Sequence, residues 1–244
     1  TLVPLAQSFN SMADRIEELI DSHKELTNAV SHELRTPISR IRFGVEMLGS
    51  AGDETVRRRH LQGISMDVDE MEALLSGLMT YARFDRGAPE LVVQDVEISS
   101  WLKDLVEGTA NGRGGHEVTF TADPALAGKT VRIEPFYMGM AVSNLLVNAG
   151  RHAQRRVAVA LELGDGECVI HVDDDGPGVP EEDREKIFSP FVRLDSSRDR
   201  NTGGHGLGLA IVSRVVRWHG GRVEVETSGL GGARFTIRWL GSVS

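Results

Sequence analysis

The chain has 244 residues, enough for about two domains of ordinary size. Its 40% hydrophobic and 26% charged residues are typical of a folded soluble protein and argue against a disordered or fibrous chain. The formal net charge is −9, so a concentrated basic face, and with it a nucleic-acid partner, is not expected. No apolar run approaches the roughly 18 residues of a membrane helix, so we expect no membrane contact from this stretch. Cys168 cannot form an internal disulfide, and we expect a buried, reduced thiol.

Apolar positions recur at alternating fours and threes over the first 30 residues, which predicts a helical coiled-coil seam. So narrow a stripe is naturally buried against an identical helix, which predicts a homodimer. Residues 5–13 also resemble the second helix of a HAMP signalling module. This resemblance implies that residues 1–22 end such a module and that a membrane-anchored sensor precedes them; a generic dimerising coil is the alternative. The chain begins at Thr1 without a methionine, and we expect it to be the cytoplasmic fragment of an inner-membrane sensor.

The next feature is the run Ser31 to Pro37, SHELRTP, within a helical apolar pattern that continues to about Gly49. An imidazole is mostly neutral at pH 7, so one ring nitrogen of His32 could attack an electrophile while Glu33 holds or removes the proton on the other. A lone His-Glu pair is more often only the polar edge of a helix. Pro37 removes a backbone donor, which predicts a bend just past this pair.

The seven-residue pattern resembles the H box of bacterial sensor histidine kinases of two-component systems. The resemblance implies that His32 is the phosphorylation site and that Glu33 is its acid/base partner. It also implies relay of the phosphate to an aspartate of a response regulator, of the winged-helix OmpR type. Thr36 would orient water when the same helix face dephosphorylates that regulator.

Residues 50–53 predict a turn with a helix cap, followed by a second helix with a regular seam. The seam positions are Leu61, Ile64, Val68, Met71, Leu75, Leu78 and Ala82. Two such helices cannot enclose a core, but two copies of the hairpin can form a four-helix bundle. We therefore expect residues 23–87 to be a dimerisation and histidine-phosphotransfer domain.

Arg86 to Pro89 breaks the helical pattern and marks a domain boundary. After it, strand-like and helical stretches alternate, which predicts an α/β two-layer sandwich. The family resemblance implies that residues 88–244 adopt the Bergerat (GHKL) ATP-binding fold. Strands are expected at 91–98, 117–121, 130–133, 156–163, 167–173, 222–227 and 233–239, and helices near 99–110, 135–151 and 206–219.

Asn144, Asn148 and Arg151 fall on one face of the second of these helices, at spacings of four and three. A solvated helix face would look the same. The stretch resembles the N box of the kinase family, which implies nucleotide contacts from Asn144, a Mg²⁺ ligand in Asn148, phosphate contacts from Arg151, and contact of His152 with the base or ribose. Mg²⁺ needs only one or two protein oxygens besides phosphate and water, so a single amide suffices.

Asp174, Gly176 and Gly178 follow a strand in the order of the family's first glycine box. That match assigns Asp174 to the adenine amino group and the two glycines to the base pocket. An ordinary turn at a strand end would look similar. The adjacent Asp173 and Asp175 are expected to be solvent-facing or structural.

Residues 187–193 resemble the F box, which includes Arg193 among the expected nucleotide-binding residues. Residues 195–202 are polar without an apolar period and are interpreted as a lid over the nucleotide, with an ordinary loop as the alternative. A glycine-rich turn then opens an apolar helix, and backbone donors at such a position favour phosphate. It resembles the second glycine box and implies phosphate or lid contacts from Gly204, Gly206, Leu207 and Gly208.

The order of these boxes along the chain carries more weight than any one of them. It predicts an ATP-dependent, autophosphorylating protein-histidine kinase that uses ATP and Mg²⁺, acts as a homodimer and serves a response regulator. Two other classes stay open: a conformational ATPase of the gyrase, mismatch-repair and heat-shock chaperone kind, and a non-catalytic dimeric signalling scaffold. Acid-labile phosphoprotein would separate the kinase from the first, and ATP binding would separate it from the second.

Overall fold

The computed structural model describes residues 3–50, 52–85, 91–110, 116–164, 166–194 and 206–241, and it describes side chains only from residue 24 onward. The predicted coiled-coil seam, the break at 86–89, the lid at 195–202 and Gly204 therefore lie outside the described side chains or residues. The chain divides into two compact units, Thr1–Ser76 and Gly77–Ser244, with the division inside the second helix. Within the described part, no helix is both long and apolar enough to cross a membrane.

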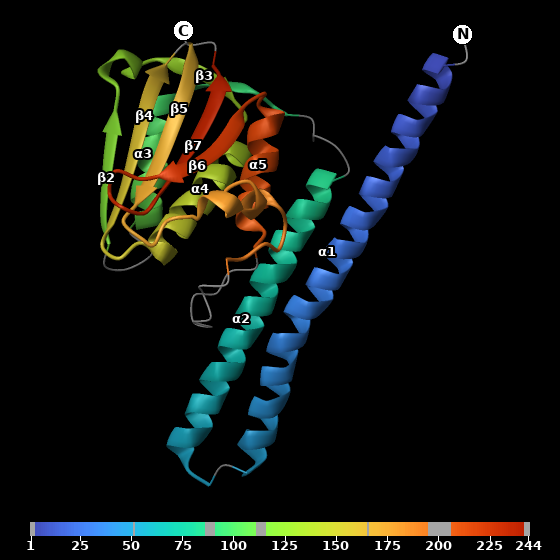
Figure 1. The fold of residues 1–244 in the computed structure, drawn as a ribbon. Coiled ribbons are helices and arrows are strands. Elements are labelled where there is room, and N and C mark those ends of the chain that lie inside the picture. Colours follow the sequence, from blue (N-terminus) through green and yellow to red (C-terminus); the bar gives the residue numbers. More distant parts are fainter. Residues whose placement is uncertain are drawn as a thin grey trace. The chain divides into compact units, whose positions relative to one another are not determined.

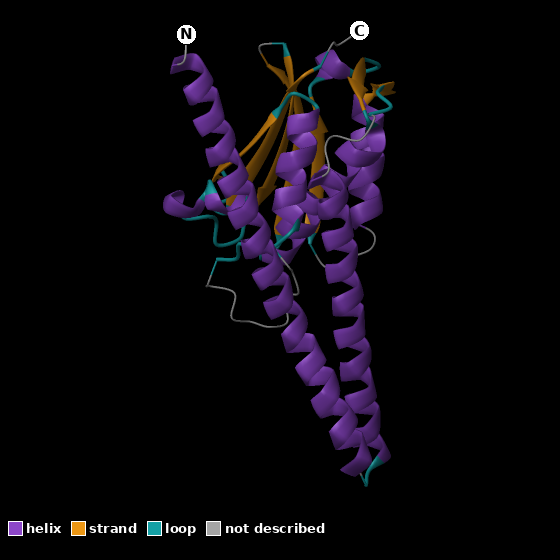
Figure 2. Ribbon diagram, turned by 90° about the vertical axis from the view of Figure 1, so that its right-hand side faces the viewer, coloured by secondary structure: helices purple, strands orange, loops and turns teal. Residues whose placement is uncertain are grey.

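The first unit is a helical hairpin of α1 (Val3–Ser50) and the larger part of α2 (Glu54–Asp85), as Figures 1 and 2 show. Asp53 caps α2, because its Oδ1 accepts the backbone N–H of Thr55 at 2.8 Å. The predicted turn and cap are thus confirmed. Pro37 is buried and lies inside α1, which continues through it as one helix; the bend stays a prediction.

Ion pairs and one close approach join the two helices of the hairpin. The Nε of Arg40 on α1 lies 2.8 Å from the Oδ1 of Asp67 on α2, and its guanidinium also pairs with Glu70. Burial raises the pKa of Asp67, while Arg40 opposes that shift. At Gly44 a Cβ would lie only 2.9 Å from the Cγ1 of Ile64, so the helices approach closely there.

The hairpin leaves many apolar side chains exposed in the single chain, as expected of half a four-helix bundle. Phe43 is 59% exposed and Met66 is 69% exposed. Among the hairpin side chains that the structure describes, the other large exposed apolar residues are Ile38, Val45, Val56, Leu61, Val68, Leu75 and Met79.

The second unit is built on a five-stranded sheet with three helices against one of its faces (Figure 1). The helices are α3 (Ile98–Ala110), α4 (Pro135–His152) and α5 (Gly208–Trp218). The sheet order is β2 (Glu117–Ala122), β4 (Arg156–Gly164), β5 (Glu167–Asp174), β7 (Ala233–Leu240), β6 (Arg222–Thr227). Only the β2–β4 pair is parallel within it. The predicted two-layer α/β sandwich is confirmed.

A second, two-stranded sheet pairs β1 (Gln94–Glu97) antiparallel with β3 (Thr130–Ile133). The strand predicted over residues 91–98 is therefore shorter than expected. It begins three residues later and ends one residue earlier than predicted. The end has a local reason: the side chain of Glu97 accepts the backbone N–H of Ser100 at 2.8 Å and so caps α3, which begins at Ile98. Among the longer elements, α5 starts two residues later than predicted.

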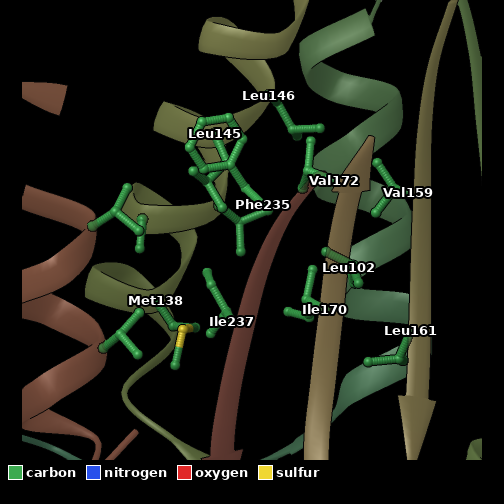
Figure 3. Packing of buried hydrophobic residues seen from close by; sticks show 14 of the residues in the cluster. Leu102, Met138, Leu145, Leu146, Val159, Leu161, Ile170, Val172, Phe235 and Ile237 are labelled. Atoms are coloured by element: carbon green, nitrogen blue, oxygen red, sulfur yellow. The ribbon is translucent and has the colours of Figure 1, made fainter. Parts of the chain in front are cut away.

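The core lies between the sheet and the helices, where the strand register stacks large side chains in rows (Figure 3). One row is Val159, Val172 and Phe235, and the next is Leu161, Ile170 and Ile237. Met138, Leu145 and Leu146 of α4 pack against these rows, and Leu102 comes from α3. Cys168 is buried as predicted, and burial raises the pKa of its thiol to about 11.

The close packing of Gly221 against β7 yields a test of this core. A Cβ there would meet the carbonyl oxygen of Arg238 and lie 2.9 Å from the Cβ of Trp239. We expect Gly221→Ala to lower the free energy of unfolding by about 2–3 kcal/mol, because backbone must shift to admit the methyl group. Denaturant unfolding followed by tryptophan fluorescence measures this, since all three tryptophans lie in the second unit.

The matched control is Gly229→Ala, because a Cβ at Gly229 meets nothing within 4 Å. It should change the free energy of unfolding by less than about 1 kcal/mol. Equal stability of the two variants would contradict the packing described around Gly221.

Candidate functional site

The predicted phosphorylation site lies on α1, in the first unit. His32 and Thr36 are exposed in the single chain and, being four residues apart, share one helix face. Glu33 is partly buried. The neighbouring hydroxyls are held by the helix itself, because Ser31 donates to the carbonyl of Thr27 and Ser39 to that of Arg35, each at 2.8 Å. Because His32 itself is exposed, its imidazole is open to an incoming electrophile in the single chain.

The other predicted site residues within the described part lie in the second unit. Helix α4 begins at Pro135 behind the cap residue Glu134, whose Oε2 accepts the backbone N–H of Tyr137 at 2.6 Å. Farther along, the Nδ2 of Asn144 donates to the carbonyl of Met140 at 2.8 Å, so its Oδ1 is the end that faces outward from that bond. Asn148 and Arg151 follow on α4, both partly buried.

Asp174 ends β5 and is only 2% exposed. Its Oδ1 accepts two backbone N–H groups, from Gly176 at 2.8 Å and from Ala233 at 3.2 Å. Burial raises the pKa of this carboxyl, and the two backbone bonds work against that shift. Because both bonds end on Oδ1, Oδ2 is the oxygen that can meet a ligand.

Two glycines make room for this carboxylate. A Cβ on Gly176 would lie 2.5 Å from the carbonyl oxygen of His152, and one on Gly232 would lie 2.5 Å from the backbone nitrogen of Gly176. The end of α4, the end of β5 and the turn before β7 thus meet at Asp174. Gly178 has φ +75 and adjoins the carbonyl of Gly232. In the sequence, the pair Gly231-Gly232 resembles only the last and least specific glycine turn of the family, and nothing there places Gly232 beside Asp174.

The two flanking aspartates are structural, which is one of the two alternatives predicted for them. Asp173 accepts hydrogen bonds from the Oγ of Ser228 at 2.6 Å and the Nε of Arg234 at 2.8 Å. Asp175 takes three backbone N–H groups on one oxygen, at 2.8, 3.0 and 3.1 Å, from Gln154, Arg155 and Arg156. These bonds lower the pKa of Asp175 and fix the turn that follows α4 beside Asp174.

His152 is the last residue of α4; its carbonyl oxygen adjoins Gly176, and the residue is exposed. Desolvation lowers the pKa of the imidazole, Arg151 adds to that shift, and Asp174 opposes it. The shift favours the neutral ring, in which one nitrogen accepts and the other donates a hydrogen bond.

The F box and the second glycine box are joined directly. Gly206 has φ +66, and its carbonyl accepts the backbone N–H of Phe191 at 2.9 Å; a Cβ there would lie 2.7 Å from the Cα of Phe191. Leu207 is buried, whereas Arg193 is exposed. At Gly208 a Cβ would lie 2.8 Å from the Oδ1 of Asn144, so the start of α5 touches the N box.

The described residues hold no group of three or more His, Cys, Asp or Glu that could bind a metal by itself. A bound Mg²⁺ would then take most of its oxygen ligands from phosphate and water, which is how Mg²⁺ is commonly held in nucleotide sites. An amide oxygen such as that of Asn148 fits this requirement. The N box, the two glycine boxes and the F box therefore lie together in the second unit, joined by the contacts at Asp174, Gly206 and Gly208.

The comparisons with known proteins cover both units. Residues 22–87 match the His Kinase A (phospho-acceptor) domain, and residues 133–242 match the family of histidine kinase-, DNA gyrase B- and HSP90-like ATPases. The chain is 40% identical over 239 residues to the sensor protein RstB of Escherichia coli (strain K12), covering 96% of this chain and 53% of RstB. It is 34% identical over 238 residues to the sensor histidine kinase CpxA of the same strain, covering 96% of this chain and 50% of CpxA.

Among solved structures, full-length ShkA in complex with AMPPNP aligns with a TM-score of 0.64 at 26% identity, covering 88% of this chain and 45% of ShkA. The chain spans about half the length of the curated relatives that it matches. The chain has a phospho-acceptor domain followed by an ATPase domain, and it is similar to these sensor proteins over nearly its whole length. Together these matches identify the family. The chain belongs to the sensor histidine kinases of two-component systems.

Proposed function

We propose that the protein transfers the γ-phosphoryl group of ATP to His32 and then relays it to an aspartate of a response regulator. The observation that carries this proposal is the exposed SHELRTP face of α1 in the same chain as a buried aspartate framed by glycines. Of the two alternatives, a conformational ATPase does not account for the phospho-acceptor domain, and a non-catalytic scaffold does not account for the hydrogen-bonded, glycine-framed Asp174.

Nucleotide binding is supported by the ATPase family match and by the AMPPNP complex of ShkA. In the proposal, Oδ2 of Asp174 accepts a hydrogen bond from the adenine amino group. Gly176 and Gly178 shape the base pocket, and His152 lies beside the base or ribose. Asn144, Arg151, Arg193 and the turn at Gly204, Gly206, Leu207 and Gly208 serve the phosphates. Backbone donors at the start of α5 favour negative charge. Mg²⁺, with Asn148 as its ligand, would neutralise charge on the phosphates.

In the proposed transfer, a ring nitrogen of His32 attacks the γ-phosphorus in line with the leaving oxygen. A nitrogen–phosphorus bond forms, the bond to the β,γ-bridging oxygen breaks, and ADP leaves with the electron pair. Glu33 holds or removes the proton on the other ring nitrogen, so the attacking nitrogen keeps its lone pair. Positioning and charge neutralisation supply most of the rate, and His32 supplies the nucleophile.

The partners follow from the same family membership. The phospho-acceptor domain and the exposed apolar side chains of the hairpin support a homodimer, formed through the hairpin and the N-terminal coil. The regulator is proposed to be of the winged-helix OmpR type. Because the matched relatives are named sensor proteins and are about twice as long, we infer that this chain is the cytoplasmic part of an inner-membrane sensor with a HAMP helix at residues 1–22.

The first prediction concerns the nucleophile. With γ-labelled ATP and Mg²⁺, the wild-type chain should acquire label that is lost in acid and kept in alkali, as expected of a phosphoramidate. His32→Gln should reduce this label by at least about 100-fold while ADP binding stays within about twofold, because the nucleotide contacts lie in the other unit. Label that persists in the variant would place the nucleophile elsewhere. ATP hydrolysis without label in the wild type would favour the conformational ATPase.

The second prediction concerns Thr36, which shares the exposed face of His32. If its hydroxyl orients the attacking water, Thr36→Ala should slow dephosphorylation of a phosphorylated regulator by at least about tenfold. Its autophosphorylation should stay within about threefold of wild type. The assay follows loss of label from a regulator that the labelled kinase has itself phosphorylated.

Ser39→Ala is the matched control, because this exposed hydroxyl lies one turn away and already donates to the carbonyl of Arg35. It should leave dephosphorylation unchanged. A full dephosphorylation rate in Thr36→Ala would overturn the role of Thr36.

A further inference from the structure

We propose that His219 is a positioning residue for the nucleotide site: as a neutral imidazole it bridges the end of α5 to the start of α4. The inference rests on the proposed function, since it concerns the two helices that carry the N box and the second glycine box. It is argued from the two hydrogen bonds that the ring makes and from the position of Glu134, one of its two partners, at the start of α4.

The first observation is the pair of contacts that the ring makes. His219 follows the last residue of α5, and its Nδ1 lies 2.9 Å from the carbonyl oxygen of Val215 in the preceding turn. Its Nε2 lies 3.1 Å from the backbone nitrogen of Glu134, 85 residues earlier in the chain. The ring therefore joins the C-terminal end of α5 to the residue that caps α4.

These partners decide the protonation of the ring. A carbonyl oxygen can only accept, so Nδ1 must carry the proton; a backbone N–H can only donate, so Nε2 must keep its lone pair. Only the neutral Nδ1–H tautomer satisfies both bonds. Phenylalanine would keep the ring and lose both bonds, whereas glutamine offers one donor and one acceptor.

The second observation is how firmly Glu134 is tied to α4. Its side chain accepts the N–H of Tyr137 at 2.6 Å, and its carbonyl accepts the N–H of Met138 at 3.1 Å. Glu134 is 9% exposed, so its own N–H would be short of a partner without His219. The rings of Tyr137 and Trp218 also meet edge to face beside this link, 5.8 Å apart.

The third observation lies at the other end of α5, where Gly208 adjoins the Oδ1 of Asn144 in the middle of α4. The two helices are thus matched at two places: His219 with Glu134, and Gly208 with Asn144. A change in the first match moves α4 along or away from α5, and that motion shifts Asn144 and Asn148 relative to the glycine turn. His219 thereby fixes the positions of Asn144 and Asn148 relative to the glycine turn, and with them the nucleotide site.

The experiment measures Mg²⁺-ADP affinity by calorimetry on the full 244-residue chain at pH 8, with folding checked by circular dichroism. We expect His219→Phe to weaken affinity by at least about tenfold, because it leaves the N–H of Glu134 unpaired. His219→Gln should stay within about threefold of wild type. Arg217→Ala is the matched control; the exposed side chain of Arg217 donates to the carbonyl of Ser213 within α5, and its loss should change affinity less than twofold.

A second readout is the tautomer itself, from ¹⁵N spectra of histidine-labelled protein with His219→Phe identifying the resonances. We expect a proton on Nδ1 and none on Nε2. The opposite tautomer would overturn the proposal, as would full affinity in a folded His219→Phe or equal losses in the Phe and Gln variants. Absence of nucleotide binding by the wild-type chain would instead defeat the proposed function, and this inference with it.

Discussion

The nucleotide half of this protein depends on one buried carboxylate. Asp174 is held by two backbone N–H groups on one oxygen, in a space that exists only because Gly176 and Gly232 lack side chains. Burial alone would favour the protonated form, and the backbone bonds favour the carboxylate. Because Oδ1 is held by the backbone, Oδ2 is fixed in place and can accept a hydrogen bond from a ligand. Recognition of an amino group on a base requires such a fixed acceptor.

The surroundings of Asp174 explain why the elements of the fold end where they do. Asp175 gathers three backbone N–H groups of the turn after α4, and Asp173 ties the end of β5 to Ser228 and Arg234. The face of α1 that carries His32 differs: in the single chain it is exposed, it has the carboxylate of Glu33 beside it, and its helix pairs with α2. The two parts of the proposed reaction thus lie in separate units, and the proposed transfer requires the nucleotide to reach His32.

Much of this could be predicted from the sequence because the signals are local. Alternating apolar residues gave the strands, threes and fours gave the helices, and the order of the boxes gave the family. Three features could not be predicted. Glu97 caps α3 and so ends β1 one residue before the predicted position. The part that Gly232 plays depends on a neighbour 58 positions away in sequence, and the link from His219 to Glu134 spans 85 residues. Such pairings come from the tertiary fold, which local patterns do not contain.

The most direct test of the account compares two nucleotides that differ at the group Asp174 is proposed to read. Inosine diphosphate carries a carbonyl oxygen where ADP carries the amino group, so it would set an acceptor against a carboxylate. The wild-type chain should bind inosine diphosphate at least about tenfold more weakly than ADP, and Asp174→Asn should lose most of that preference. Equal affinity of the wild-type chain for both nucleotides would contradict the role of Asp174 and the site built around it.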